Sequence, residues 1–243
     1  MTSEHIVKSY DDELSRLNRE IVEMGGMAEA QLAAAMRALN EQDDDLAASI
    51  IEEDDKVDEL NFDIDQFAVQ LLALRQPMAE DLRSIVGALK TSSDLERIAD
   101  YAANVAKRVI AMDDYPPTRL TTGIPRMAAL VQPMIKDVLD AYVAHDSEKA
   151  MEVWHRDIEV DDMYMSLFRE FLTYMMEDPR NITPCTHLLF MAKNIERIGD
   201  HVTNIAETIY FLVHGKRMRE YRPKIDEGDS VVTTLASRDK SKG

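Results

Sequence analysis

The chain contains a single cysteine, Cys185, in 243 residues, and this scarcity bears on where the protein works. One thiol cannot form an internal disulfide, and chains without disulfides are typical of reducing compartments. The sequence also lacks an apolar run near the ~20 residues that a membrane-spanning helix needs, and no signal-peptide pattern opens it. We therefore predict a cytoplasmic protein that reaches a membrane only indirectly, through a partner.

Positive charge is scarce as well. The 46 Asp and Glu residues far outnumber the 28 Lys and Arg residues, which gives a formal net charge of −18 at pH 7. A surface of this sign repels a phosphate backbone, so we expect no nucleic-acid partner. With 45% hydrophobic residues, the chain can nevertheless enclose a substantial core.

Glycine and aromatic residues are also few, with eight Gly and 6% Phe, Trp and Tyr, whereas Met is frequent at 15 residues. This composition favours helix over strand, because strands prefer β-branched and aromatic residues. The sequence has no Gly-rich loop of the kind that cradles phosphates, and no recognisable spacing of a nucleophile and its base. We therefore predict an all-α protein that is not an enzyme.

Apolar residues recur at helical spacing in six segments, which are separated by breaks rich in Gly, Pro or Asp. We predict helices over residues 10–40, 46–74, 78–112, 126–144, 146–177 and 185–214. Gly25 and Gly26 interrupt the first helix, and we expect a weak point there because a helical glycine costs about 1 kcal/mol relative to alanine. The segment 113–125 has no apolar periodicity and is interpreted as a linker.

The half of the chain before this linker resembles the half after it. DLERIAD at 94–100 is matched by NIERIGD at 194–200, and DDKVDEL at 54–60 is matched by DIEVDDM at 157–163. A period near 100 residues is too long for a solenoid unit of about 20–50 residues. The sequence thus predicts a tandem repeat of two three-helix bundles, at 8–112 and 126–215. A charged and disordered tail is expected at 216–243.

The repeated segments place acidic residues four positions apart on two helices of each repeat. On a helical wheel these carboxylates fall on the outer faces of helices that are neighbours in a bundle. The eight residues are Asp54, Asp58, Glu96, Asp100, Asp157, Asp161, Glu196 and Asp200. Like charges at this spacing destabilise a helix by about 0.2–0.5 kcal/mol per pair. Oxygen ligands without cysteine suit hard cations, iron or manganese, so we treat these residues as candidate metal ligands.

A simpler interpretation exists for each pair, because acidic residues on an outer helical face are usually only solvated. The arginine that follows each motif glutamate can also neutralise it as a surface ion pair. Glu152 and His155 match one half of the motif of carboxylate di-iron bundles, but such a site needs two copies. His201 follows Asp200 directly and is interpreted as a surface histidine.

DLERIADYAANVAKRV and NIERIGDHVTNIAETI, in tandem, resemble the PhoU family of phosphate-transport regulators. The resemblance covers about residues 8–215 and includes QPMAEDLR and HLLFMAKNIERIGDH. It implies two three-helix bundles, a homodimer, and metal ions or clusters on the eight acidic residues named above. The metal itself, among iron, manganese, zinc and magnesium, stays open. Ala99 departs from the family pattern, which more often has glycine there, and its methyl group narrows access to the first site.

The resemblance also implies a function. It is negative regulation of the phosphate-starvation response and of phosphate uptake, by protein contact between the phosphate ABC transporter and its phosphate-sensing histidine kinase. Two other classes stay open, a metal-binding helical adaptor without a phosphate role and a carboxylate-bridged metalloenzyme. Turnover that is lost on mutation of Glu196 would favour the enzyme, whereas absence of bound metal would favour a purely structural adaptor.

Overall fold

The computed structural model describes residues 2–75, 77–112 and 119–218, which form six long helices and two short 3₁₀ turns. In chain order these are α1 (Thr2–Glu41), α2 (Asp44–Arg75), α3 (Glu80–Ile110), η1 (Arg119–Thr122), α4 (Gly123–Ala144), α5 (Ser147–Glu177), η2 (Pro179–Asn181) and α6 (Ile182–His214). These ranges contain no strand, which confirms the all-α prediction. None of their helices is both long and apolar enough to cross a membrane.

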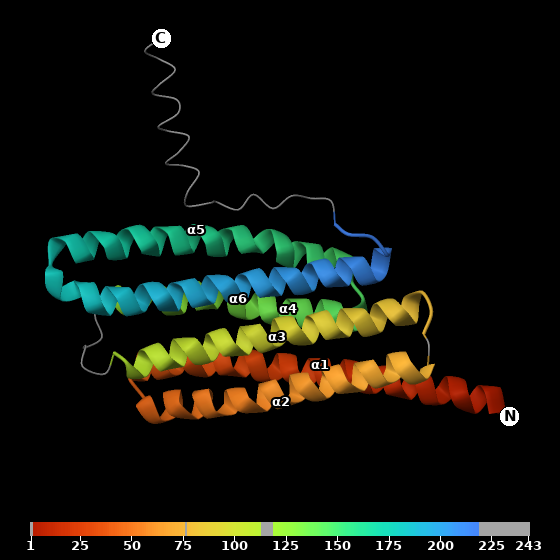
Figure 1. The fold of residues 1–243 in the computed structure, drawn as a ribbon. Helices are drawn as coiled ribbons and strands as arrows, with labels where there is room; N and C mark the ends of the chain where they lie inside the picture. The colour runs from red at the N-terminus through yellow and green to blue at the C-terminus, as the bar shows by residue number, and fades with distance from the viewer. Residues whose placement is uncertain (1, 76, 113–118, 219–243) are drawn as a thin grey trace, which may run out of the picture.

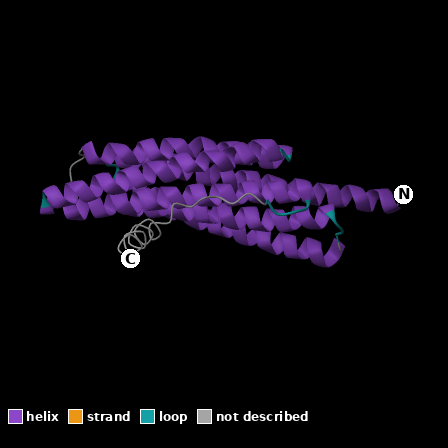
Figure 2. Ribbon diagram, turned by 90° about the horizontal axis from the view of Figure 1, so that it is seen from above, coloured by secondary structure: helices purple, strands orange, loops and turns teal. Residues whose placement is uncertain are grey.

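The helices form two three-helix bundles, α1–α3 and α4–α6, which lie side by side along one long axis (Figures 1 and 2). α3 and α6 lie in the middle of the molecule and make the most extensive contact between the bundles, and α1 also packs on α4. Equivalent helices of the two repeats therefore meet each other. The predicted tandem repeat of two three-helix bundles is confirmed.

α3 and α6 run antiparallel, because residues early in α3 lie against residues late in α6. Near one end of the contact Gly87 lies against Leu212, and near the other the guanidinium of Arg108 lies 4.6 Å from the ring centre of Phe190. The copies of the repeated motif, which occupy the middle of each helix, consequently come together near the centre of the molecule.

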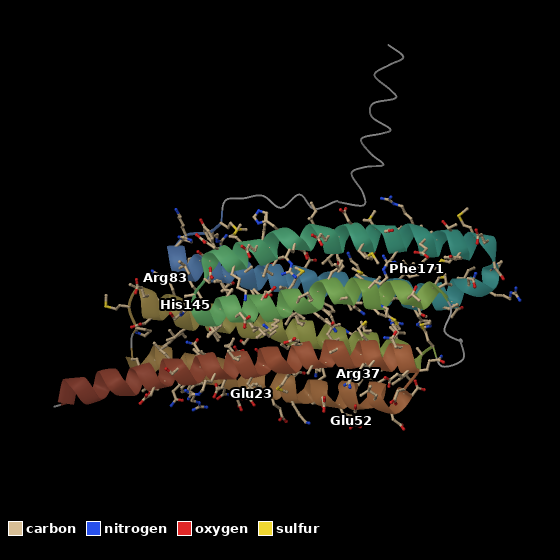
Figure 3. All side chains as sticks on the ribbon, turned by 180° about the vertical axis from the view of Figure 1, so that it is seen from behind. Glu23, Arg37, Glu52, Arg83, His145 and Phe171 are labelled. Carbon is tan, nitrogen blue, oxygen red and sulfur yellow. The ribbon has the colours of Figure 1, made fainter. Side chains whose placement is uncertain are left out.

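The core is formed by the apolar stripes that the helical periodicity predicts. In α3 the following apolar residues at helical spacing are all buried: Leu95, Ile98, Ala102, Val105 and Val109. Phe171 of α5 is fully buried within the second bundle, whereas Glu23 and Arg37 of α1 and Glu52 of α2 are exposed on the first (Figure 3). Burial of these apolar stripes is the main contribution to the stability of the helices, because amphipathic helices are stabilised mostly by tertiary packing.

Aspartate side chains define the starts of two helices. Asp146 precedes α5, and its Oδ1 accepts hydrogen bonds of 3.0 Å from the backbone N–H groups of Glu148 and Lys149. Asp43 does the same for α2, with Leu46 N–H as donor at 2.9 Å. Each carboxylate satisfies otherwise unpaired N–H groups and complements the positive end of the helix dipole.

Three helices begin at least three residues earlier than predicted, and one of them is α6, which begins at Ile182 and not at residue 185. α1 begins at Thr2 and not at residue 10, because the first 24 residues contain neither Gly nor Pro to stop it. α4 begins at Gly123, inside the predicted 113–125 linker, and Pro125 is tolerated because the first turn of a helix needs no N–H partner. Residues 113–118 of that linker, and 219–243 of the predicted tail, lie outside the described residues.

α1 also continues through Gly25 and Gly26 without a break in the helix. Gly25 is buried where α4 crosses α1, and a Cβ added there would lie 2.4 Å from Cδ2 of Leu139. Gly26 is exposed, and a Cβ added there would have no neighbour within 4 Å. The first glycine therefore serves the contact between the two bundles, and the second has no packing role.

Gly25→Ala and Gly26→Ala form a matched pair that tests this contact. Both remove a helical glycine, and we expect Gly26→Ala to raise the free energy of unfolding by about 0.5–1 kcal/mol. Gly25→Ala gains the same helix propensity but overpacks Leu139, so it should be about 1–3 kcal/mol less stable than Gly26→Ala. Urea denaturation followed by circular dichroism measures both, and equal stabilities would contradict a close contact at Gly25.

Candidate functional site

Four predicted ligand residues of the first repeat come together where α2 packs on α3. We call Asp54 and Asp58 of α2, with Glu96 and Asp100 of α3, the first acidic cluster. Asp58 is exposed, and the other three are partly buried. Oδ1 of Asp54 is shielded from solvent and receives no hydrogen bond from the part of the chain that the structure describes.

The proximity of these carboxylates is visible in the pKa of Asp54, which is raised from 3.8 to about 6. Burial is the largest cause, since it disfavours the charged form. The negative charges of Asp100, Asp58 and Glu96 raise the pKa further, and the positive charge of Lys107 opposes them. At neutral pH Asp54 is still ionised, and its raised pKa means that this charge lowers the stability of the folded state.

Glu96 shows the same effect more weakly. Burial raises the pKa of Glu96, the Arg97 guanidinium opposes this, and the charges of Asp58 and Asp100 add to it. Nε of Arg97 lies 3.3 Å from Oε2 of Glu96, and its Nη1 lies 3.8 Å from Oδ2 of Asp100. The surface ion pair suggested for this arginine thus exists, but the pKa of Glu96 remains raised, chiefly because the side chain is partly buried.

The second acidic cluster consists of Asp157 and Asp161 of α5 with Glu196 and Asp200 of α6. Asp157 is fully buried at 0% exposure, and the other three are partly buried. Lys193 donates a 3.0 Å hydrogen bond to Oε1 of Glu196. This cluster therefore lies deeper in its bundle than the first cluster does.

His201 is not the surface histidine that the sequence suggests. It is partly buried in the contact between the repeats, where its Nδ1 lies 2.8 Å from Oδ1 of Asp94 on α3. Asn204 donates a 3.3 Å hydrogen bond to the same oxygen, and the ring of Tyr101 lies 5.6 Å from the imidazole. These contacts join α3 to α6 beside the acidic clusters.

Several observations bear on whether the clusters suit a metal ion. Their carboxylate oxygens are the donors that hard cations, iron and manganese take, and one such oxygen, Oδ1 of Asp54, is shielded without a hydrogen bond. In the side-chain conformations of the described residues, however, no three His, Cys, Asp or Glu groups converge tightly enough to hold a metal. The residues fit a metal by the type of their donor atoms, and binding would require carboxylates on adjacent helices to rotate toward one another.

The comparisons with known proteins agree with this geometry. The family model described as "PhoU domain" matches residues 21–109 and 124–209, so each match contains one acidic cluster. The chain belongs to the PhoU family. Its PhoU relatives include proteins named phosphate-specific transport system accessory protein PhoU homolog from Caulobacter vibrioides and Rhizobium meliloti. The Caulobacter protein is 51% identical to this chain, and the match covers 92% of this chain and 98% of the relative. The Rhizobium protein is 50% identical, and the match covers 98% of this chain and 99% of the relative.

The fold is also that of a solved PhoU structure. The crystal structure of PhoU from Pseudomonas aeruginosa superposes with a TM-score of 0.83 at 38% sequence identity. The match covers 85% of this chain and all of the other. The PhoU resemblance inferred from the repeated motif is therefore confirmed, together with the fold that it implies.

Sequence reasoning missed the residues that join the two repeats. Asp94 corresponds to Asn194, and His201 to Tyr101, so only one of the two related positions has a carboxylate facing an imidazole. This difference between the repeats was the available signal. It could be interpreted only after the antiparallel contact of α3 with α6 was known, since that contact brings residues about 100 positions apart together.

Asp54→Asn tests the raised pKa. The folded-state value of about 6 lies above 3.8, so the folded protein takes up the Asp54 proton first as the pH falls. Asp54 therefore lowers stability at pH 7, and this loss disappears between pH 6 and 4. We expect Asp54→Asn to stabilise the metal-free protein by about 1–2 kcal/mol at pH 7, after allowance for partial exposure, and by nothing at pH 4.

Asp55→Asn is the matched control, because Asp55 is the next residue of α2 and is exposed. It removes the same charge without removing a shielded carboxylate. Chemical denaturation at pH 4, 5, 6 and 7 with chelator present gives the three stability curves. If Asp54→Asn and Asp55→Asn change the free energy of unfolding equally at every pH, the pKa of Asp54 is not raised by its surroundings.

Proposed function

We propose that the protein is a negative regulator of the phosphate-starvation response and of phosphate uptake. It acts in the cytoplasm, by contact between the phosphate ABC transporter and the phosphate-sensing histidine kinase. The observation that carries the proposal is the match of nearly the whole chain to PhoU relatives named as accessory proteins of the phosphate-specific transport system. The PhoU resemblance further supports a homodimer as the acting form.

The surface charge supports a function through binding. The net charge of −18 favours association with basic regions of a partner, and such steering acts mainly on the association rate. A regulator that binds a kinase must also prefer one kinase state over another, because equal affinity for both shifts no equilibrium. We therefore propose that the protein binds the kinase state that is inactive when phosphate is plentiful.

The acidic clusters supply the second part of the proposal. Asp54, Asp58, Glu96 and Asp100, and in the second repeat Asp157, Asp161, Glu196 and Asp200, would hold iron, manganese, zinc or magnesium. A bound cation would supply positive charge that offsets the repulsion among these carboxylates. Because the metal would bind the folded state only, it would also stabilise the fold.

A second candidate function is a metal-binding adaptor without a phosphate role. The specific observation in its favour is the shielded Oδ1 of Asp54, together with the raised pKa of this group. Groups of this kind gather at functional sites, whatever the pathway served. The adaptor and the phosphate regulator share the same clusters and differ in their partners.

A deletion strain with a phosphate-starvation reporter distinguishes the two. In high phosphate we expect the reporter to rise in the deletion strain and to fall again when the wild-type gene is returned. Pull-downs from the complemented strain should recover cytoplasmic parts of the transporter and of the kinase. The association rate with either partner should fall as salt rises, because salt screens the attraction between charges.

Silence of the reporter in the deletion strain, together with pull-downs that recover neither partner, would exclude the phosphate role. The adaptor would then be the better candidate. The wild-type gene on the same plasmid is the control for expression level.

A further inference from the structure

The two acidic clusters differ in depth, and the difference can be followed to a single position in α6. A Cβ added at Gly199 would lie 2.5 Å from Oδ1 of Asp157, closer than real Cβ contacts come. In this conformation the carboxylate of the fully buried Asp157 lies in the space that a side chain at residue 199 would take. Its carboxylate lies against the α6 backbone, between the turns that carry Glu196 and Asp200.

The first repeat has a methyl group at the matching position. Ala99 occupies the place of Gly199 in the repeated motif, and Asp54 occupies the place of Asp157. Ala99 is fully buried, whereas Asp54 remains partly exposed. We call a fully buried carboxylate of a cluster its floor carboxylate and the others its rim carboxylates. The second cluster has one floor carboxylate, Asp157, whereas the first has none, although Oδ1 of Asp54 is shielded from solvent.

A floor carboxylate binds a cation differently from a rim carboxylate. Charges interact more strongly where water is excluded, since the effective dielectric constant is lower there. A side chain held between two helices also loses less conformational entropy when it takes a ligand, which is the usual benefit of preorganisation. A cation between α5 and α6 should consequently be held more tightly than one between α2 and α3.

We propose that Gly199 positions Asp157 and thereby makes the second acidic cluster the tighter of two metal sites in this protein. The ligands are Asp157 from the floor and Asp161, Glu196 and Asp200 from the rim. Lys193 donates a hydrogen bond to Oε1 of Glu196, and this oxygen would have to give up that bond to take a cation. The inference rests on the proposed metal role and adds to it a ranking of the two sites.

Manganese is a suitable probe, because Mn²⁺ prefers oxygen ligands and its electron paramagnetic resonance reports free and bound ion. The chelator-stripped full chain is titrated with Mn²⁺ by calorimetry and by resonance. We expect two classes of site. Glu196→Gln should remove the tight class, and Glu96→Gln should remove the weak one.

Gly199→Ala should weaken the tight class by about 10–100-fold, the range seen when groups that orient a metal ligand are removed. Ala99→Gly makes the reverse change, and it should tighten the weak class because Asp54 can then approach the α3 backbone. Gly26→Ala is the matched control, since it makes the same Gly-to-Ala change at an exposed helical position with nothing within 4 Å. It should leave both affinities unchanged.

Thermal unfolding of each metal-free variant separates loss of metal affinity from loss of fold. If Gly199→Ala does not fold, Ala99→Gly decides the matter by its effect on the weak class. The proposal is overturned if Gly199→Ala binds Mn²⁺ as the wild type does, if Ala99→Gly leaves the weak class unchanged, or if Glu96→Gln removes the tight class. Absence of any Mn²⁺ binding by the wild type also overturns it. The phosphate reporter, which needs no metal titration, would still test the regulatory role separately.

Discussion

The antiparallel contact between α3 and α6 is the interaction on which the rest of the structure depends. Each of these helices packs on both other helices of its own bundle and on its counterpart in the other bundle. Helices enclosed in this way need small side chains so that their axes can approach. α3 accordingly buries five alanines and a glycine: Gly87, Ala88, Ala99, Ala102, Ala103 and Ala106. α6 buries Gly199 and Ala206 at comparable places.

This enclosure leaves α3 and α6 only a narrow outer strip for polar residues, and the chain places carboxylates there. In the first repeat the result is an aspartate, Asp54, whose pKa is raised to about 6 by burial and by three acidic neighbours. A helical bundle gains no stability from such an arrangement, and apolar or neutral residues would serve the packing better. These carboxylates therefore do not serve the packing of the bundle, and the metal role proposed above would give them a purpose.

The two repeats have similar backbone folds, but the residues at some matching positions differ in chemistry. The contact of His201 with Asp94 has no counterpart in which Tyr101 faces a carboxylate, because residue 194 is an asparagine. The two clusters also differ in burial, since Asp157 is fully buried beside Gly199, whereas Asp54 is partly exposed in the repeat that has Ala99. The two repeats thus present carboxylates at matching positions but with different burial. The contact of α3 with α6 joins the two repeats through directly packed residues.

The sequence by itself determined the all-α class, the six helices, the two repeats and the eight acidic residues on neighbouring helices. Helical periodicity and an internal repeat are local patterns, so they can be read without knowledge of distant contacts. Family membership followed from the same repeated motif. The start of α4 at Gly123 was missed because Gly and Pro in a first turn look like a linker.

Only the tertiary structure decided how deep each carboxylate lies and what each glycine is for. Asp54 and Asp157 have matching places in the repeated pattern, yet one is partly exposed and the other is fully buried. Gly25 looks like a weak point of α1 and is instead the place where Leu139 of α4 packs. Burial, pKa and close approach depend on atoms from helices far apart in the chain, and no local pattern contains them.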